Sequence, residues 1–197
     1  MSEFRSANRG QLIVLCGPAG VGKSTIARQL VDSIGARYAV SATTRDQRPG
    51  DDKGKIYEYI DQSEFFRRLD ADQFLEYAQV HGQYYGTPRH PTLDDLSAGK
   101  DVLLDIDVQG ALQLRYQYPD SLLIFILPPD EPTLLERMQS RARDSAEEIT
   151  RRFRAAKREI HMAKGSRAFD HMVINDDLDR AVSEIRRIIS NKKAGAL

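Results

Sequence analysis

Short apolar runs alternate along the chain with segments in which apolar residues recur every three or four positions. The runs are typical of buried strands, and they lie at residues 12–16, 38–41, 102–106, 122–127 and 172–174. Strands that alternate with helices favour a parallel sheet with helices on both of its faces. The pattern therefore predicts an α/β fold.

Three helices are predicted from their end signals and their apolar stripes. The first covers residues 23–34. Ser145 and Glu148 have the spacing of a capping box, which would begin a long charged helix that reaches about Lys164. Asp176 and Asp177 precede the last helix, whose apolar stripe consists of Leu178, Val182, Ile185 and Ile189.

The region from Thr43 to about Pro91 interrupts this alternation. It is rich in Arg, Asp, Gly, Tyr and Phe, and it contains strand-like segments at 56–60 and 74–80 with a short helical piece at 63–69. A chain of 197 residues fits one domain of ordinary size. We therefore interpret this region as a lobe inserted into a single domain.

Composition and charge exclude several classes of protein. Lys plus Arg and Asp plus Glu number 29 each, so no long-range field draws the molecule to nucleic acid or to an anionic membrane, and an anionic ligand needs a local cluster of cations. The single cysteine, Cys16, lies in an apolar run and allows no internal disulfide. Because no signal peptide or membrane span is recognisable, we expect a soluble cytoplasmic protein without an obligatory protein partner.

Residues 17–24 match the motif G-x-x-x-x-G-K-[ST] between a predicted strand and a predicted helix, which is the context that this motif needs. Glycines let backbone N–H groups surround phosphate oxygens at the helix N-terminus. Lys23 would bridge the β- and γ-phosphates, and Ser24 would bind Mg²⁺. The ATP-binding residues predicted here are Gly17, Pro18, Ala19, Gly20, Val21, Gly22, Lys23, Ser24 and Thr25.

The plain alternative is a glycine-rich turn that binds nothing and leaves Lys23 in solvent. Such a turn has no need of the Gly-Lys-Ser ending. The motif predicts a nucleoside triphosphate as ligand, but it does not distinguish water, a protein or a small molecule as the acceptor.

The sequence motifs of the lobe indicate which molecule accepts the phosphoryl group. The run Ser41-Ala-Thr-Thr-Arg45-Asp-Gln-Arg48-Pro-Gly50, followed by Gly54, Tyr57, Glu76-Tyr-Ala and Tyr84-Tyr85-Gly86-Thr87-Pro88, closely resembles the guanylate kinase family. The resemblance extends from Gln11 to about Ile189. It implies a P-loop nucleoside monophosphate kinase that transfers the γ-phosphoryl group of ATP to GMP, and to dGMP, with Mg²⁺ as cofactor.

The resemblance also assigns residues to the acceptor. Its phosphate would be held by Arg45, Arg48, Tyr57 and Tyr85, which suits guanidinium groups that bind phosphate through two nitrogens. Guanine would be recognised by Glu76, Ser41 and Thr87. The alternative is a charged aromatic surface, in which the arginines pair with Asp46 and Asp51 and the tyrosines pack on the core.

Acidic and basic residues of the core complete the implied site. The resemblance assigns Asp105 to the metal and Asp107 to the guanine side, although these two roles could be exchanged. It assigns Arg137, Arg141 and Arg152 to a lid that closes over ATP, and it places Asn175 near the adenine. With Lys23 and Arg45, the three lid arginines form the predicted catalytic set, and Arg143 is an extra candidate. The alternative is a solvated basic helix with ion pairs such as Glu148 with Arg152.

The lid departs from the family in one respect. The family has Gly-Arg-Gly where this chain has Ser140-Arg141-Ala142, which would slow closure of the lid. The layout implied is a single domain at 11–190 with core segments 11–42, 96–136 and 156–190, a GMP-binding lobe at 43–95, a lid at 137–155, and tails at 1–10 and 191–197.

An acceptor phosphate is already anionic near neutral pH, so the transfer needs no general base and the four histidines need no catalytic role. Two rival functions remain open at this point. One is an inactive scaffold domain of the same family, which would typically lack Lys23 and some lid arginines. The other is a ribose bisphosphate kinase, whose acceptor lobe would not require Glu76 and Thr87 together with the Thr-Thr-Arg-x-x-Arg run.

Overall fold

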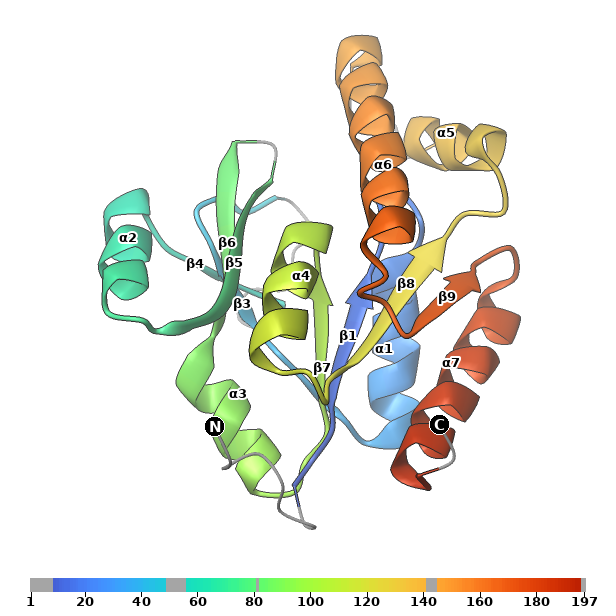
Figure 1. Ribbon diagram of the computed structural model, residues 1–197. Helices are drawn as coiled ribbons and strands as arrows, with labels where there is room; N and C mark the ends of the chain where they lie inside the picture. Colours follow the sequence, from blue (N-terminus) through green and yellow to red (C-terminus); the bar gives the residue numbers. More distant parts are fainter. Residues whose placement is uncertain (1–8, 49–55, 81, 141–144, 196–197) are drawn as a thin grey trace.

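Five parallel strands in the order β2-β7-β1-β8-β9 form the central sheet of the computed structural model, which describes residues 9–48, 56–80, 82–140 and 145–195 (Figure 1). The strands are β1 (Leu12–Cys16), β2 (Arg37–Tyr38), β7 (Val102–Ile106), β8 (Leu122–Leu127) and β9 (His171–Ile174). Every neighbouring pair in this sheet is parallel. The predicted α/β fold with a parallel sheet is confirmed.

Helices cover both faces of this sheet, because alternate residues of the central strands point to opposite sides. Ile13 and Leu15 of β1 pack on the side of α1 (Lys23–Ile34) and α7 (Leu178–Lys193). Leu12, Val14 and Cys16 pack on the other side, and the helices there are α3 (Arg89–Ser97), α4 (Val108–Gln117) and α6 (Ala146–Ser166). The strands β1, β7 and β8 are therefore buried on both faces, which explains their continuous apolar runs.

The lobe contains a second sheet with the strand order β4-β3-β6-β5. Its strands are β3 (Ser41–Thr43), β4 (Tyr57–Tyr59), β5 (Phe74–Val80) and β6 (Gln83–Pro88). Helix α2 (Gln62–Asp70) packs on it through Phe65, which stacks on Phe74 with the ring centroids 4.7 Å apart. Figure 1 shows the lobe on the left of the core.

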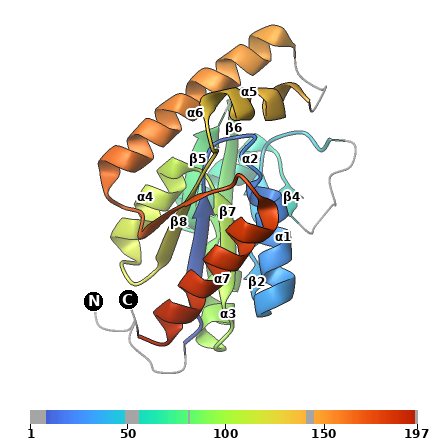
Figure 2. The ribbon, with the colours of Figure 1, turned by 90° about the vertical axis from the view of Figure 1, so that its right-hand side faces the viewer.

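Helices α5 (Glu131–Gln139) and α6 project beyond the carboxyl ends of the central strands (Figures 1 and 2). They pack together through Leu134, Met138 and Ala156. One of the two hydrogen bonds of the predicted capping box is confirmed, since the Ser145 hydroxyl accepts a hydrogen bond from Glu148 N at 3.2 Å. In the parts of the chain that the structure describes, no helix combines the length and the apolar character needed to cross a membrane.

One predicted strand is wrong. Residues 38–41 do not form a single strand, because β2 ends at Tyr38 in the central sheet and β3 begins at Ser41 in the lobe sheet. Helix α3 spans the predicted boundary between residues 95 and 96, and α6 spans the one at 155 and 156. The lobe and lid boundaries stay predictions.

Candidate active site

A cavity of about 720 Å³ is enclosed by the loop after β1, the lobe sheet, the end of β7 and helix α6. It brings most of the predicted site residues together. Those that line it are Gly17, Ala19, Lys23, Ser24, Ser41, Arg45, Arg48, Tyr57, Glu76, Tyr85, Asp105, Asp107 and Arg152. Those that lie outside its lining are Pro18, Gly20, Val21, Gly22, Thr25, Thr87, Arg137 and Asn175. Arg141 and Arg143 lie outside the described residues.

The phosphate cradle is a tight turn that depends on glycine. Gly20 and Gly22 have φ angles of 86° and 98°, which residues with a Cβ atom rarely adopt. Gly22 also leaves no room for a side chain, since a Cβ there would lie 2.6 Å from Asn175 Nδ2. The Lys23 ammonium donates to Gly17 O and, at 3.3 Å, to Pro18 O. Lys23 therefore folds back over the loop that would surround the phosphates.

Asn175 and Arg137 brace this cradle from behind. The side-chain amide of Asn175 donates from Nδ2 to Val21 O at 2.8 Å, and Asn175 is only 6% exposed. Arg137 donates from Nη1 to the backbone O of Asn175 at 2.9 Å. In this structure Asn175 contacts the loop, and Arg137 contacts the backbone just after β9. Their predicted contacts with ATP stay predictions.

Ser24 and Asp105 meet at the first turn of α1. The Ser24 hydroxyl donates to Asp105 Oδ2 at 3.0 Å. Burial raises the pKa of Asp105, while Lys23 and the bond from Ser24 oppose the rise. A hydroxyl and a carboxylate beside a phosphate cradle fit Mg²⁺, which prefers oxygen ligands and usually takes others from phosphate and water. Within the described ranges, no group of three or more His, Cys, Asp or Glu residues could hold a metal ion without such help.

Glu76 is a buried carboxyl at the lobe end of the cavity. It is 4% exposed, and Oε1 accepts a 2.6 Å hydrogen bond from the hydroxyl of Thr87, which is fully buried. Burial raises the pKa of Glu76 to about 7, although the Thr87 bond lowers it, and the nearby charge of Asp107 adds to the rise. Such a group is a strong hydrogen-bond acceptor, and no salt bridge to it is found among the described residues.

Asp107 lies where the central sheet meets the lobe. It caps α4, accepting at Oδ1 from Gly110 N at 2.9 Å, and its Oδ2 accepts from Gln109 Nε2 at 3.0 Å. Burial raises its pKa. Because Ser24 bonds to Asp105 and the charge of Asp107 acts on Glu76, the geometry favours the assignment of Asp105 to the metal and Asp107 to the base.

Aromatic rings and cations gather at the opening between the lobe and the cradle. The Arg45 guanidinium lies over the rings of Tyr57 and Tyr59, at 5.4 and 5.7 Å from their centroids. The rings of Tyr57 and Tyr85 meet edge to face at 5.9 Å. Burial raises the pKa of Tyr57, so its hydroxyl keeps its proton and can donate to an anion. Arg48 lines the same opening.

From the other side, α6 contributes Arg152 to the cavity. On the same helix, Glu148 forms an ion pair with Arg151 at 2.8 Å. Arg151 also lines the cavity. The face of α6 that lines the cavity therefore carries two arginines together with Glu148 and Glu159.

The chain matches the family model described as Guanylate kinase over residues 9–192. The chain belongs to the guanylate kinase family. A guanylate kinase from Symbiobacterium thermophilum is 44% identical over 187 residues, which cover 94% of this chain and 87% of that protein. One from Chelativorans sp. is 46% identical over 94% of this chain and 84% of its own length.

A solved structure supports the same assignment. The crystal structure of guanylate kinase from Anaplasma phagocytophilum superposes with a TM-score of 0.76 at 30% identity, over 95% of this chain and 89% of that one. The resemblance that the lobe motifs indicated is therefore confirmed. The roles of single residues stay predictions, which the geometry above supports to different degrees.

Sequence reasoning missed several lining residues of this guanylate kinase cavity, among them Arg151 and two further charged residues. Glu159 of α6 lines it, half-buried, and burial raises its pKa to about 7 despite the opposing charge of Lys23. Arg28, one turn after Ser24 on α1, lines it as well. Glu159 is part of a charged helix, and only its position seven residues after Arg152, on the same helix face, could have singled it out.

Proposed function

We propose that this chain transfers the γ-phosphoryl group of ATP to GMP, giving ADP and GDP, and that it also accepts dGMP. One observation carries the proposal: the buried Glu76, to which Thr87 donates, lines the same cavity as Lys23 of the phosphate cradle. A phosphate cradle alone would suit any nucleotide kinase. A buried carboxylate acceptor beside it is what a guanine ring, with its N–H and amino donors, requires.

Glu76 selects the base, because guanine and adenine differ in the hydrogen bonds that they can donate to its carboxylate. Guanine offers a ring N–H and an exocyclic amine to the carboxylate, and Ser41 can donate to its carbonyl oxygen. Thr87 can do so only if its hydroxyl leaves Glu76, to which it now donates. Adenine has no such ring N–H, so a bound adenine would leave the desolvated carboxylate partly unpaired. Sites built on buried polar pairs can reject an analogue by as much as about 10⁴ to 10⁵.

The acceptor phosphate is held by two cations and two hydroxyls. Arg45 and Arg48 supply the charge, and Tyr57 and Tyr85 supply neutral donors at the same opening of the cavity. The phosphate needs no base to remove a proton, since its second pKa is about 6. The protein therefore aligns the acceptor phosphate and need not remove a proton from it.

The donor phosphates are held by the cradle. Lys23 leaves the loop carbonyls to which it now donates and binds the β- and γ-phosphates. Ser24 and Asp105 would hold Mg²⁺, which would neutralise part of the charge of the phosphates. Arg152, with Arg137 and Arg141, stabilises charge on the transferred group and keeps water out when the helices close.

The two rival functions explain less of this site. A scaffold domain has no use for Lys23 and Arg152 in one cavity with Glu76. A ribose bisphosphate kinase has no use for a buried acceptor shaped by Thr87. Small molecules are thus the partners proposed, and the cytoplasmic location stays a prediction.

The test is ADP formation by purified protein with ATP and Mg²⁺, presenting GMP, dGMP, AMP, CMP, UMP and ribose bisphosphate separately. We expect turnover with GMP and dGMP that exceeds turnover with the other acceptors by at least about 10³. Comparable turnover with AMP would refute the role of Glu76. Absence of turnover with every acceptor, in a protein that still binds ATP, would favour the scaffold function.

A further inference from the structure

Strand β5, which carries Glu76, is an edge strand of the lobe sheet. An edge strand has backbone N–H and C=O groups that no neighbouring strand satisfies. Here α4 of the core lies along that edge (Figure 1). Gln113 of α4 accepts at Oε1 from Tyr77 N at 3.2 Å and donates from Nε2 to Tyr77 O at 2.7 Å. The side chain of Gln113 thus binds Tyr77 as a strand would.

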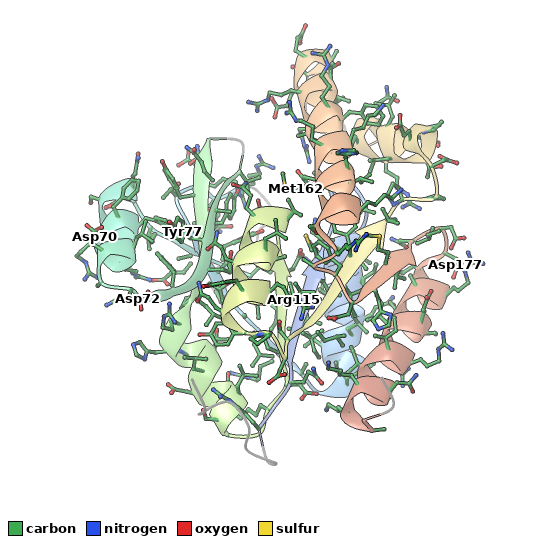
Figure 3. The ribbon with its side chains drawn as sticks, viewed as in Figure 1. Asp70, Asp72, Tyr77, Arg115, Met162 and Asp177 are labelled. Atoms are coloured by element: carbon green, nitrogen blue, oxygen red, sulfur yellow. The ribbon has the colours of Figure 1, made fainter. Side chains whose placement is uncertain are left out.

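A second glutamine extends this contact. Gln109 donates from Nε2 to Gln79 O at 3.4 Å. Residues 109 and 113 lie one helical turn apart, roughly 6 Å, which is close to the spacing of alternate residues on a strand. Two side chains of one helix face therefore match the outward backbone groups of Tyr77 and Gln79. Figure 3 labels Tyr77 on this strand of the lobe.

The same helix face shapes the surroundings of Glu76. A Cβ on Gly110 would lie only 2.0 Å from Glu76 Oε2, so the carboxyl packs directly on the α4 backbone. Gln109 also donates to Asp107, which caps α4 and lines the cavity. Tyr77 follows Glu76 in the chain, so a clamp on both backbone groups of Tyr77 limits where the Glu76 carboxyl can lie.

We infer that Gln113 is a positioning residue for base recognition: by clamping Tyr77 to α4 it fixes Glu76 in the acceptor site and so sets the affinity and selectivity for guanine. This inference rests on the proposed function. Gln113 does not line the cavity, so we expect no direct contact with an acceptor bound there. Its effect passes through the backbone of β5.

The test compares three variants with the wild type. Gln113→Met keeps the length of the side chain and removes both hydrogen bonds. Gln113→Glu keeps an acceptor for Tyr77 N and loses the donor to Tyr77 O. Gln117→Met is the matched control, since Gln117 is exposed one turn further along α4. Each is assayed for KM with GMP, KM with ATP, and preference for GMP over inosine monophosphate, which lacks the exocyclic amine.

We expect Gln113→Met to raise the KM for GMP by about tenfold, because two hydrogen bonds that hold the strand are lost. Its KM for ATP should stay within about twofold of the wild type, and its preference for GMP over inosine monophosphate should fall. Gln113→Glu should lie between Gln113→Met and the wild type. The Tyr77 amide should exchange with deuterium faster in Gln113→Met, whereas Gln117→Met should match the wild type throughout.

The outcomes separate this inference from the proposed function. If the wild type does not phosphorylate GMP, the proposed function fails before any variant is compared. If the wild type is active but Gln113→Met keeps its KM and selectivity despite faster exchange at Tyr77, Gln113 only covers an edge and the inference is overturned. Equal increases in KM for GMP and ATP, with a lower melting temperature, would also overturn it, since they indicate general destabilisation.

Discussion

Glu76 and Thr87 are cross-strand partners on β5 and β6, and the Thr87 hydroxyl donates to the Glu76 carboxyl at 2.6 Å. Thr87 is fully buried and Glu76 nearly so. The pair holds a hydrogen-bond acceptor in a place where water cannot satisfy it fully. Burial of this carboxyl therefore destabilises the ligand-free protein, and the same burial strengthens its hydrogen bonds to a bound acceptor.

This burial predicts the pH dependence of GMP binding. The pKa of Glu76 is raised to about 7, and guanine needs the ionised form, so binding below pH 7 requires a proton to leave first. We expect the affinity for GMP to fall by up to about tenfold for each pH unit below 7. Calorimetric titration from pH 6 to 8 in two buffers of different ionisation enthalpy would count the proton released.

The GMP phosphate titrates in part of the same range, because its second pKa is about 6. Glu76→Gln separates the two contributions, since only the phosphate contribution remains in that variant. An affinity of the wild type that stays constant between pH 6.5 and 8 would contradict the prediction.

The same shift predicts that Glu76→Gln stabilises the ligand-free protein at high pH. Glutamate ionises near 4.5 when exposed and near 7 here, so the unfolded chain loses this proton first and stability falls as pH rises between those values. Above pH 7 the loss of stability caused by the buried charge of Glu76 reaches its full size. At pH 8 the variant should be more stable by as much as about 3 kcal/mol, and at pH 4 the difference should vanish.

Urea unfolding at both pH values measures this. Glu184→Gln on α7, half-buried and outside the cavity, is the matched control and should change stability by less than about 0.5 kcal/mol at either pH. A Glu76→Gln variant that is equally destabilised at pH 4 and pH 8 would show that the burial of the charge has no cost.

Local signals explain which parts of the fold could be predicted. The predicted helix at residues 23–34 and the predicted strand at 74–80 coincide with α1 and β5. Ser145 caps α6 as its spacing with Glu148 indicated. Each of these elements is specified by residues within its own segment, either by a cap or by a continuous or periodic apolar pattern.

Other elements depend on contacts that a single segment does not encode. The break between β2 and β3 comes from the chain leaving one sheet for another. Helix α4 packs on the core through Ala111 and Leu114, and its polar Gln109 and Gln113 bind the lobe strand, a contact that the sequence of the helix alone does not indicate. Its role in the site could be recognised only once β5 was placed beside it.

Gly110 provides a further prediction on this helix. It adopts ordinary helical geometry, so alanine would favour the helix by about 1 kcal/mol, but its Cβ would lie 2.0 Å from Glu76 Oε2 and 2.9 Å from Cδ. The carboxyl would have to move away from α4. We expect Gly110→Ala to lower kcat/KM for GMP at least about tenfold, with ATP binding unchanged.

The matched control is Gly165→Ala on α6, where a Cβ meets nothing within 4 Å. It should gain helix stability without any effect on GMP. Steady-state kinetics with each substrate varied in turn measure both variants. A Gly110→Ala enzyme with unchanged kcat/KM would mean that Glu76 does not need its present position.

The last prediction concerns the brace behind the cradle. Asn175 donates to Val21 O, and its amide occupies the space beside Gly22, so Asn175→Ala would leave a buried carbonyl without this donor and open a gap behind the loop. We expect a loss of stability of about 1 to 3 kcal/mol. The KM for ATP should rise about five- to tenfold, because the loop amides lose their arrangement around the phosphates. Acceptor binding should not change, because the lobe is untouched.

Kinetics with ATP and GMP varied separately, together with thermal unfolding, distinguish these effects. Asn191→Ala, exposed on α7, is the matched control and should leave both KM values and the melting temperature as in the wild type. If Asn175→Ala raised the KM for GMP as much as that for ATP, the brace would act on the whole cavity. If it changed neither, the cradle would keep its shape through its glycine turn alone, and Asn175 would serve only to close the end of β9 against α1.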